Sequence, residues 1–281
     1  RDADVALNVT GAQELRDDHA DLRRVLYIQS DPFGLQIDLD DGDEWTSDQV
    51  GRHDRHFTFG ELIGTPSCEL PTGGVDWLPT RPAVALELWP PQPQGESFTT
   101  VTTWRNDTKH RLWKGEKYFW TKDREFLSIV DLPRRTSARL ELAIDGIAEE
   151  AGSMRDNGWS IVSRPELVSD VDAYRAYVGG SRGEFTIARD QVVRPRTGWF
   201  SDRSASYLAA GRPVITQDTG FGEVLPTGHG LFSFSGVDEA AAALDEVVRD
   251  PEGHARAARE IAGEYFAAER VLSSILARAG D

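Results

Sequence analysis

The stretch TGWFSDRSASYLAAGRPVITQDTGFG, residues 197–222, decides the fold. Ser201 or Asp202 can cap a helix of about ten residues, which Gly211 and Pro213 then end. The apolar residues 214–216 predict a strand that runs into a second glycine-rich loop, residues 219–222. This order places a helix N-terminus beside the end of a buried strand. Free backbone N–H groups and a partial positive charge there suit a phosphate.

Basic residues gather just before and within this stretch. Residues 182–203 carry five arginines and three acids, so the window is net +2 in a chain of net −16. Arginine is well suited to bidentate contacts with phosphate, which agrees with an anion site at the predicted helix start. The arginines are Arg182, Arg189, Arg194, Arg196 and Arg203, and the acids are Glu184, Asp190 and Asp202.

Composition limits the class of protein. The 281 residues suggest about two domains, and the strong acidity argues against a general binder of nucleic acid or anionic membrane. No window resembles a transmembrane segment or a signal peptide, so we expect a cytoplasmic protein. The single cysteine, Cys68, excludes an intrachain disulfide and a cysteine-rich zinc site.

Strand and helix signals alternate along the first part of the chain. Strands are predicted at residues 4–9, 25–29 and 56–59, the first of them buried, with a helix at 15–24. A short helix is predicted at 60–64, and a solvated acidic loop at 38–44. This order indicates βαβ units with a parallel sheet. Five prolines in residues 79–96 predict an interdomain linker.

The alternation restarts after the linker. Strands are predicted at residues 98–104, 139–144, 159–162, 184–188 and 214–216. Helices are predicted at residues 118–131, 149–157, 168–178, 201–210, 238–248, 251–266 and 271–279. The sequence therefore predicts an α/β fold of two domains, residues 1–90 and residues 91–281. Neither a Gly-x-Gly-x-x-Gly dinucleotide motif after a strand nor a Gly-Lys-[Ser/Thr] loop is present.

The stretch from Gly198 to Gly220, with the turn at residues 225–232, resembles the donor-binding segment of GT-B-fold glycosyltransferases. The likeness implies two Rossmann-like domains with parallel sheets that face each other across a cleft, the C-terminal one holding a nucleotide-diphosphate sugar. Residues 53–89 resemble the end of the N-terminal domain in bacterial members. About 90 residues precede the linker, where the family has roughly 150–200. The N-terminal, acceptor-side domain is therefore expected to be incomplete.

The resemblance also implies roles for single residues. Backbone N–H groups near Ser201, Asp202 and Arg203 would hold the leaving phosphate, and Arg105 would contact a phosphate across the cleft. Residues 187–190 would approach the nucleobase of the donor. The family needs no divalent metal as a rule, so the expected ligand set is the nucleotide sugar and an acceptor, without a cofactor. The remaining expected donor-binding residues are Gly198, beside the helix, Asp218, near the sugar hydroxyls, and Gly220 and Phe221, which would line the sugar pocket.

The sequence departs from the family in its catalytic residues. Many retaining members carry two glutamates, and alignment on Gly211 puts Gly198 and Ser206 at those places. Plant-type inverting members have an asparagine where Phe200 stands. The stereochemical outcome and the catalytic base are therefore unassigned. His53 and His56 are candidates for the base by position alone.

Three functions fit these observations. The first is a glycosyltransferase that moves a hexose from a nucleotide-diphosphate sugar to an acceptor. The second is a non-catalytic protein that binds a sugar nucleotide or a partner, with a degenerate acceptor domain. The third is a hexose epimerase on the same fold, although the acidic residues that it would need around the sugar are not found.

Overall fold

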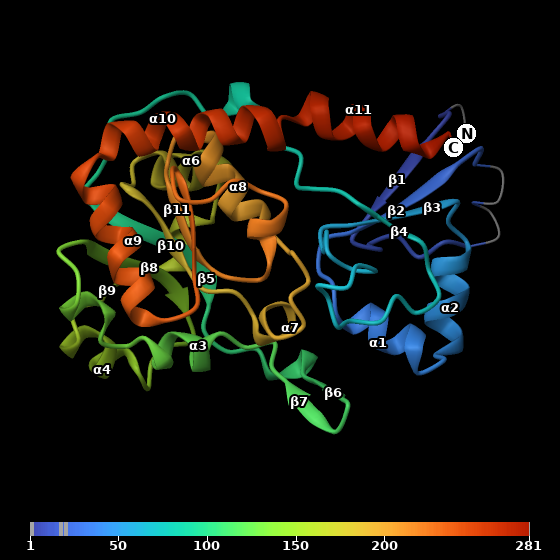
Figure 1. Cartoon of the computed structure of the whole chain (residues 1–281), viewed down its shortest axis with the longest axis horizontal. Helices are drawn as coiled ribbons and strands as arrows, with labels where there is room; N and C mark the ends of the chain where they lie inside the picture. The colour runs from blue at the N-terminus through green and yellow to red at the C-terminus, as the bar shows by residue number, and fades with distance from the viewer. Residues whose placement is uncertain (1–2, 17–18, 20–21, 281) are drawn as a thin grey trace.

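The computed structural model describes residues 3–16, 19 and 22–280, which form two lobes, each built on a parallel sheet (Figure 1). The sheet of the first lobe has the order β1-β2-β3-β4, with every neighbouring pair parallel. Its strands are β1 (Ala6–Val9), β2 (Val25–Gln29), β3 (Arg55–Thr58) and β4 (Trp77–Pro79), and its helices are α1 (Gly34–Asp40) and α2 (Glu44–Gly51).

The second lobe has a six-stranded parallel sheet of order β12-β11-β10-β5-β8-β9. The predicted α/β architecture with two parallel sheets is therefore present. The strands are β5 (Ser97–Thr103), β8 (Arg139–Asp145), β9 (Ser160–Ser163), β10 (Gly183–Thr186), β11 (Val214–Gln217) and β12 (Leu231–Phe234).

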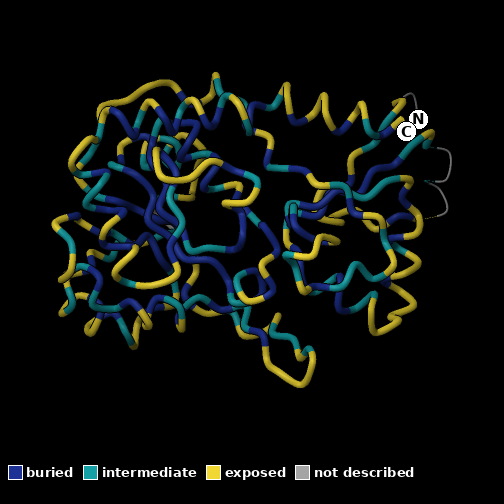
Figure 2. The backbone as a smooth tube through the Cα atoms, in the orientation of Figure 1, coloured by how far each residue is buried: buried dark blue, intermediate teal, exposed yellow. Residues whose placement is uncertain are grey.

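Helices cover both faces of the second sheet (Figure 1). Its central strands are therefore buried (Figure 2). One core contains Trp104, Phe126 and Leu244, and the other contains Tyr207 and Phe266. The helices are α3 (Asp123–Ser128), α4 (Ala151–Asp156), α5 (Arg164–Leu167), α6 (Val171–Gly179), α7 (Asp190–Val193), α8 (Asp202–Ala209), α9 (Val237–Arg249), α10 (Pro251–Ile261) and α11 (Ala268–Ala279), with a π-helical turn η6 (Ala262–Phe266).

Two predictions for the first strands and helices need correction. Residues 4–9 were expected to form a buried strand, but β1 is the edge of its sheet and leaves Leu7 and Val9 exposed. Most of the acidic segment 38–44 is not a loop: α1 continues to Asp40, and Asp43 caps α2 by accepting a hydrogen bond from the Thr46 N–H at 2.8 Å. The helix predicted at 15–24 includes residues 17, 18, 20 and 21, which lie outside the described residues.

Two further predictions are wrong because contacts between lobes override local propensity. Residues 60–64 form successive turns instead of a helix, because Gly60 pairs with Trp199 of the other lobe. Residues 118–131 are helical only in α3. Tyr118 belongs instead to a hairpin of β6 (Arg111–Trp113) and β7 (Glu116–Tyr118), and its ring lies 4.9 Å from that of Phe33.

The last helix returns to the first lobe. α10, η6 and α11 run along one side of the molecule and span both lobes (Figure 1). Val271 and Ile275 of α11 pack with Leu26, Ile28 and Phe57 of the first sheet in a single apolar core. Core packing therefore joins residues 268–279 to the first lobe, although they follow the second lobe in the chain.

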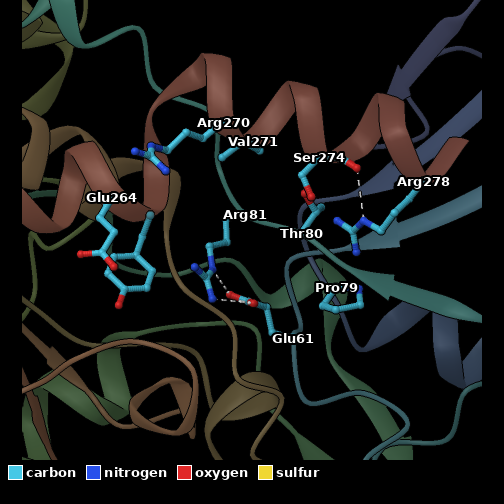
Figure 3. Close-up of a pocket in the computed structure, with 10 residues that line it drawn as sticks. Glu61, Pro79, Thr80, Arg81, Glu264, Arg270, Val271, Ser274 and Arg278 are labelled. Atoms are coloured by element: carbon cyan, nitrogen blue, oxygen red, sulfur yellow. Dashed lines mark hydrogen bonds and ion pairs between the residues drawn. The ribbon is translucent and has the colours of Figure 1, made fainter.

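An ion pair lies where the lobes join beneath α11 (Figure 3). Arg81 donates to both carboxylate oxygens of Glu61, at 2.6 and 3.0 Å, and to the carbonyl of Val224 at 3.1 Å. Its guanidinium also lies over the Tyr265 ring, 5.1 Å from the centroid. Arg81 therefore contacts both lobes at once. In the described part of the chain, no helix is both long and apolar enough to cross a membrane.

Candidate functional site

A cavity of about 420 Å³ lies beside the Arg81–Glu61 ion pair, beneath α11. A smaller cavity of about 250 Å³ opens between the lobes where several strands end. It adjoins the carboxyl ends of β2, β5 and β10, the edge at which α/β proteins bind ligands. We call it the donor cavity. It is lined by Asp31, Thr103, Asn106, Trp120, Thr121, Lys122, Arg189, Trp199, Ser201, Asp202 and Arg203.

The first turn of α8 forms one wall of the donor cavity. Ser201 is the N-cap residue, and its side chain makes no capping hydrogen bond to the helix. The Arg203 N–H donates to Asp202 Oδ1 at 2.8 Å, while the other early N–H groups have no acceptor within the helix. Gly211 follows the helix with φ +68°, as predicted for the residue that ends it. The wall of the cavity therefore contains a helix N-terminus, whose partial positive charge favours anions.

Lys122 provides a positive charge in the same cavity. It is half-buried just before α3, and no hydrogen bond or ion pair to its ammonium occurs among the residues that the structure describes. Burial lowers the pKa of Lys122 well below its usual value, and the neighbouring charges of Arg203 and Arg189 lower it further. An anion bound there would relieve both effects.

Arg203 has a different role from that of a free cation. It forms an ion pair with the fully buried Glu184 and donates to the Val101 carbonyl at 3.1 Å and to Thr186 Oγ1 at 2.8 Å. These contacts tie the start of α8 to β5 and β10. Arg203 therefore holds the first turn of α8 in place, and its charge is compensated from within the lobe.

We expect Arg203→Met to lower the free energy of unfolding by about 3–5 kcal/mol, because it leaves Glu184 buried without its partner. Urea unfolding followed by tryptophan fluorescence measures the change. The double variant Arg203→Met/Glu184→Gln is the control, and it should recover part of the loss since no unpaired charge remains. A single variant as stable as the wild type would contradict the structural role.

Arg105, predicted to contact a phosphate, lies elsewhere. Its guanidinium donates to Asp123 at 2.8 Å, to Glu149 at 3.4 Å and to Glu150 at 2.5 Å. Three carboxylates thus surround a single guanidinium, which explains why it is no free cation for a ligand. Arg105 is absent from the residues that line the donor cavity.

The predicted residues Gly198, Asp218, Gly220 and Phe221 also lie outside that lining. Gly198 has φ +73°, and a Cβ there would come 2.7 Å from Cγ of Leu62 in the first lobe. Asp218 pairs with Arg196 at 3.1 Å and accepts the Gly220 N–H at 2.8 Å, while Phe221 is fully buried in a core. Their loops pack against the first lobe, so a role beside the sugar stays a prediction.

His53 and His56 belong to the first lobe, His53 shortly after α2 and His56 in β3. His53 is buried, with ring nitrogens near the Gln49 carbonyl at 2.9 Å and the Asn8 amide at 3.0 Å. Burial is the main cause that lowers the pKa of both histidines. Neither lines the donor cavity. His53 instead lines a separate cavity of about 220 Å³ in the first lobe, and a catalytic role for either histidine stays a prediction.

The structure adds residues that the sequence did not single out. Asp31 follows β2 and lines the donor cavity together with Arg189, to which it is ion-paired. The Arg189 guanidinium lies 3.7 Å from the centroid of the Trp120 ring. The sequence could have indicated Asp31, because it is a polar residue just after a buried strand. It could have indicated Lys122, because that residue comes directly before α3.

Comparisons with solved structures identify the fold. The chain resembles the Anabaena protein HepE in complex with UDP (TM-score 0.58, 12% identity, covering 92% of this chain and 72% of that one). It also resembles sucrose-phosphate synthase from Thermosynechococcus elongatus (TM-score 0.55, 13% identity, covering 92% of this chain and 68% of that one). A third similar structure is Staphylococcus aureus TarM (TM-score 0.55, 8% identity, covering 93% of this chain and 51% of that one). No family model and no curated protein matches the sequence. The likenesses confirm the predicted GT-B fold.

Proposed function

We propose that this protein is a glycosyltransferase that moves a hexose from a nucleotide-diphosphate sugar to a hydroxyl group of an acceptor. The observation that carries the proposal is the donor cavity, where the start of α8 faces Lys122 between two GT-B lobes. One solved structure of similar fold, HepE, is described as a complex with UDP and glucose. UDP is therefore the first nucleotide to test.

In this proposal the diphosphate lies at the first turn of α8, against Lys122 and Arg189. Donors fixed in advance around a developing negative charge stabilise the leaving group. Because the chain itself brings cations to this place, the proposal assigns charge neutralisation to the protein and no role to a metal or cofactor. Addition of EDTA should then leave UDP affinity unchanged.

Asp31 is the proposed general base. It lies in the first lobe, its side chain is half-exposed, and it lines both the donor cavity and a larger neighbouring cavity. A carboxylate between a donor and an acceptor pocket can take the proton of the attacking hydroxyl. The ion pair with Arg189 would keep that carboxylate oriented.

A second candidate is binding of a sugar nucleotide without transfer. It is favoured by Gly198 and Ser206, which occupy the places of the family's glutamate pair. A side chain at Gly198 would collide with Leu62, and Ser206 donates to the Asp202 carbonyl at 3.1 Å. Neither supplies a carboxylate. Turnover distinguishes the two candidates.

The test is calorimetric titration with UDP, TDP and GDP, followed by an assay for release of UDP from UDP-glucose and other UDP-hexoses with and without sugar acceptors. The proposal expects saturable binding of at least one nucleotide and acceptor-stimulated release. Tight nucleotide binding without any release would favour the second candidate. No nucleotide binding at millimolar concentrations would reject both.

A further inference from the structure

A second cavity of about 540 Å³ lies beside the donor cavity, and both are lined by Asp31 and Trp120. A third, of about 220 Å³, adjoins the second, and both are lined by Thr10, Tyr27 and Trp45. The second and third cavities together form what we call the acceptor groove. It begins at the proposed base and leads away from the start of α8 across the first lobe.

Trp45 of α2 lies where the two parts of the acceptor groove meet, and it is 63% exposed. A large aromatic ring that stays open to water beside a cavity is unusual for a packing residue. The apolar C–H face of a sugar ring can cover such a surface and remove it from water. Trp120 is less available, because Lys109 and Arg189 lie over its ring at 4.7 and 3.7 Å.

Most charged side chains of the groove have a partner, and the exposed carboxylate of Glu14, which lines the third cavity, would repel an anion. Asp38 pairs with Arg111 of the hairpin at 3.5 Å, and Asp31 pairs with Arg189. Lys109 lies over the Trp120 ring. A charged acceptor would have to break these pairs, whereas hydroxyl groups can add to them as both donors and acceptors. The groove therefore suits an uncharged, polyhydroxylated ligand.

Thr10 adds an independent sign of a ligand site. Its φ of +63° is uncommon for a threonine, and its N–H donates to the Ile28 carbonyl at 2.7 Å. Strained backbone persists where the surrounding structure enforces it, and it concentrates at functional sites. Thr10 lines both parts of the groove, directly after β1.

We propose that the acceptor is an uncharged oligosaccharide, with its terminal sugar at Asp31 and a later sugar ring against Trp45. This inference rests on the proposed transferase function and names its acceptor class. The larger cavity alone has the volume of an ordinary small-ligand site, and the groove continues beyond it. In the transfer, the terminal hydroxyl oxygen of the acceptor forms a bond to the anomeric carbon of the donor sugar. The bond from that carbon to the diphosphate oxygen breaks, and its electron pair leaves with the nucleotide. Asp31 takes the proton of the hydroxyl group.

The test measures affinity for the gluco-oligosaccharides of the maltose and cellulose series and for the chitin series, one to five units long, with UDP present. Affinity should rise at least 10-fold from the monosaccharide to the trisaccharide in one series. Trp45→Ala should abolish that rise, and Trp45→Phe should restore part of it. Leu276→Ala, which removes an exposed side chain on α11, is the control and should change nothing.

The outcomes separate this inference from the proposed function. If UDP binds but none of these oligosaccharides does, or if affinity does not depend on length, the inference is wrong and the donor site stands. Preference for an acidic oligosaccharide such as a heparin fragment would also overturn it. If UDP itself fails to bind, the proposed function fails first.

Discussion

Replacing Asp31 with asparagine is expected to lower kcat for sugar transfer by about 10²- to 10⁴-fold, the usual contribution of a general base. The variant keeps the shape of the side chain and its reach toward Arg189 but cannot accept the hydroxyl proton. Affinity for UDP should not fall, because the proposed diphosphate contacts come from the second lobe and the variant removes a negative charge from the same cavity. Steady-state release of UDP and calorimetry measure the two quantities separately.

The matched control for Asp31 is Asp40→Asn. Asp40 ends α1 in the same lobe and is exposed, and it lines neither the donor cavity nor the acceptor groove. Its replacement should leave kcat unchanged. If Asp31→Asn retains more than about a tenth of wild-type kcat with a saturating acceptor, Asp31 is not the base.

Replacing Lys122 with methionine is expected to weaken UDP binding by about 10- to 100-fold, which corresponds to one charge-assisted hydrogen bond. Methionine keeps the apolar stem and removes the charge. The exposed Lys117 of the neighbouring hairpin gives the control Lys117→Met, which should bind UDP normally. Equal affinities of wild type and Lys122→Met would remove Lys122 from the donor site.

The pH dependence provides a second readout of Lys122. Its lowered pKa means that the ammonium loses its proton as pH rises through a range below the usual lysine value. A bound diphosphate stabilises the charged form and raises that pKa, so binding takes up a proton. Above pH 7 the second ionisation of a terminal phosphate, near 6, is complete. Wild-type affinity should therefore fall with rising pH, and Lys122→Met should lack this slope.

The sequence predicted the fold best where the signals are local. The strand at 25–29, the helix that begins after Ser201 and the strand from Val214 all appear in the structure close to their predicted bounds. Gly211 adopts the positive φ expected at the end of that helix. These features depend on residues within one turn or one strand of each other, so their patterns are readable in the sequence.

Long-range contacts explain what could not be predicted. Tyr118 packs against Phe33, about 85 residues earlier, and draws the segment before α3 into a hairpin. The five arginines near α8 indicated an anion site, but the structure commits Arg203 to the buried Glu184. Lys122 and Asp31 meet in one cavity only because the two lobes face each other. Sequence spacing carries no information on such a meeting.

The return of α11 to the first sheet has a consequence for synthesis of the chain. Leu26, Ile28 and Phe57 are synthesised more than 200 residues before Val271 and Ile275, which complete their core. One face of the first sheet thus stays uncovered until α11 has been synthesised. The second lobe can form its own cores before the core of the first lobe is complete. The two lobes are therefore completed in the opposite order to that in which they are synthesised.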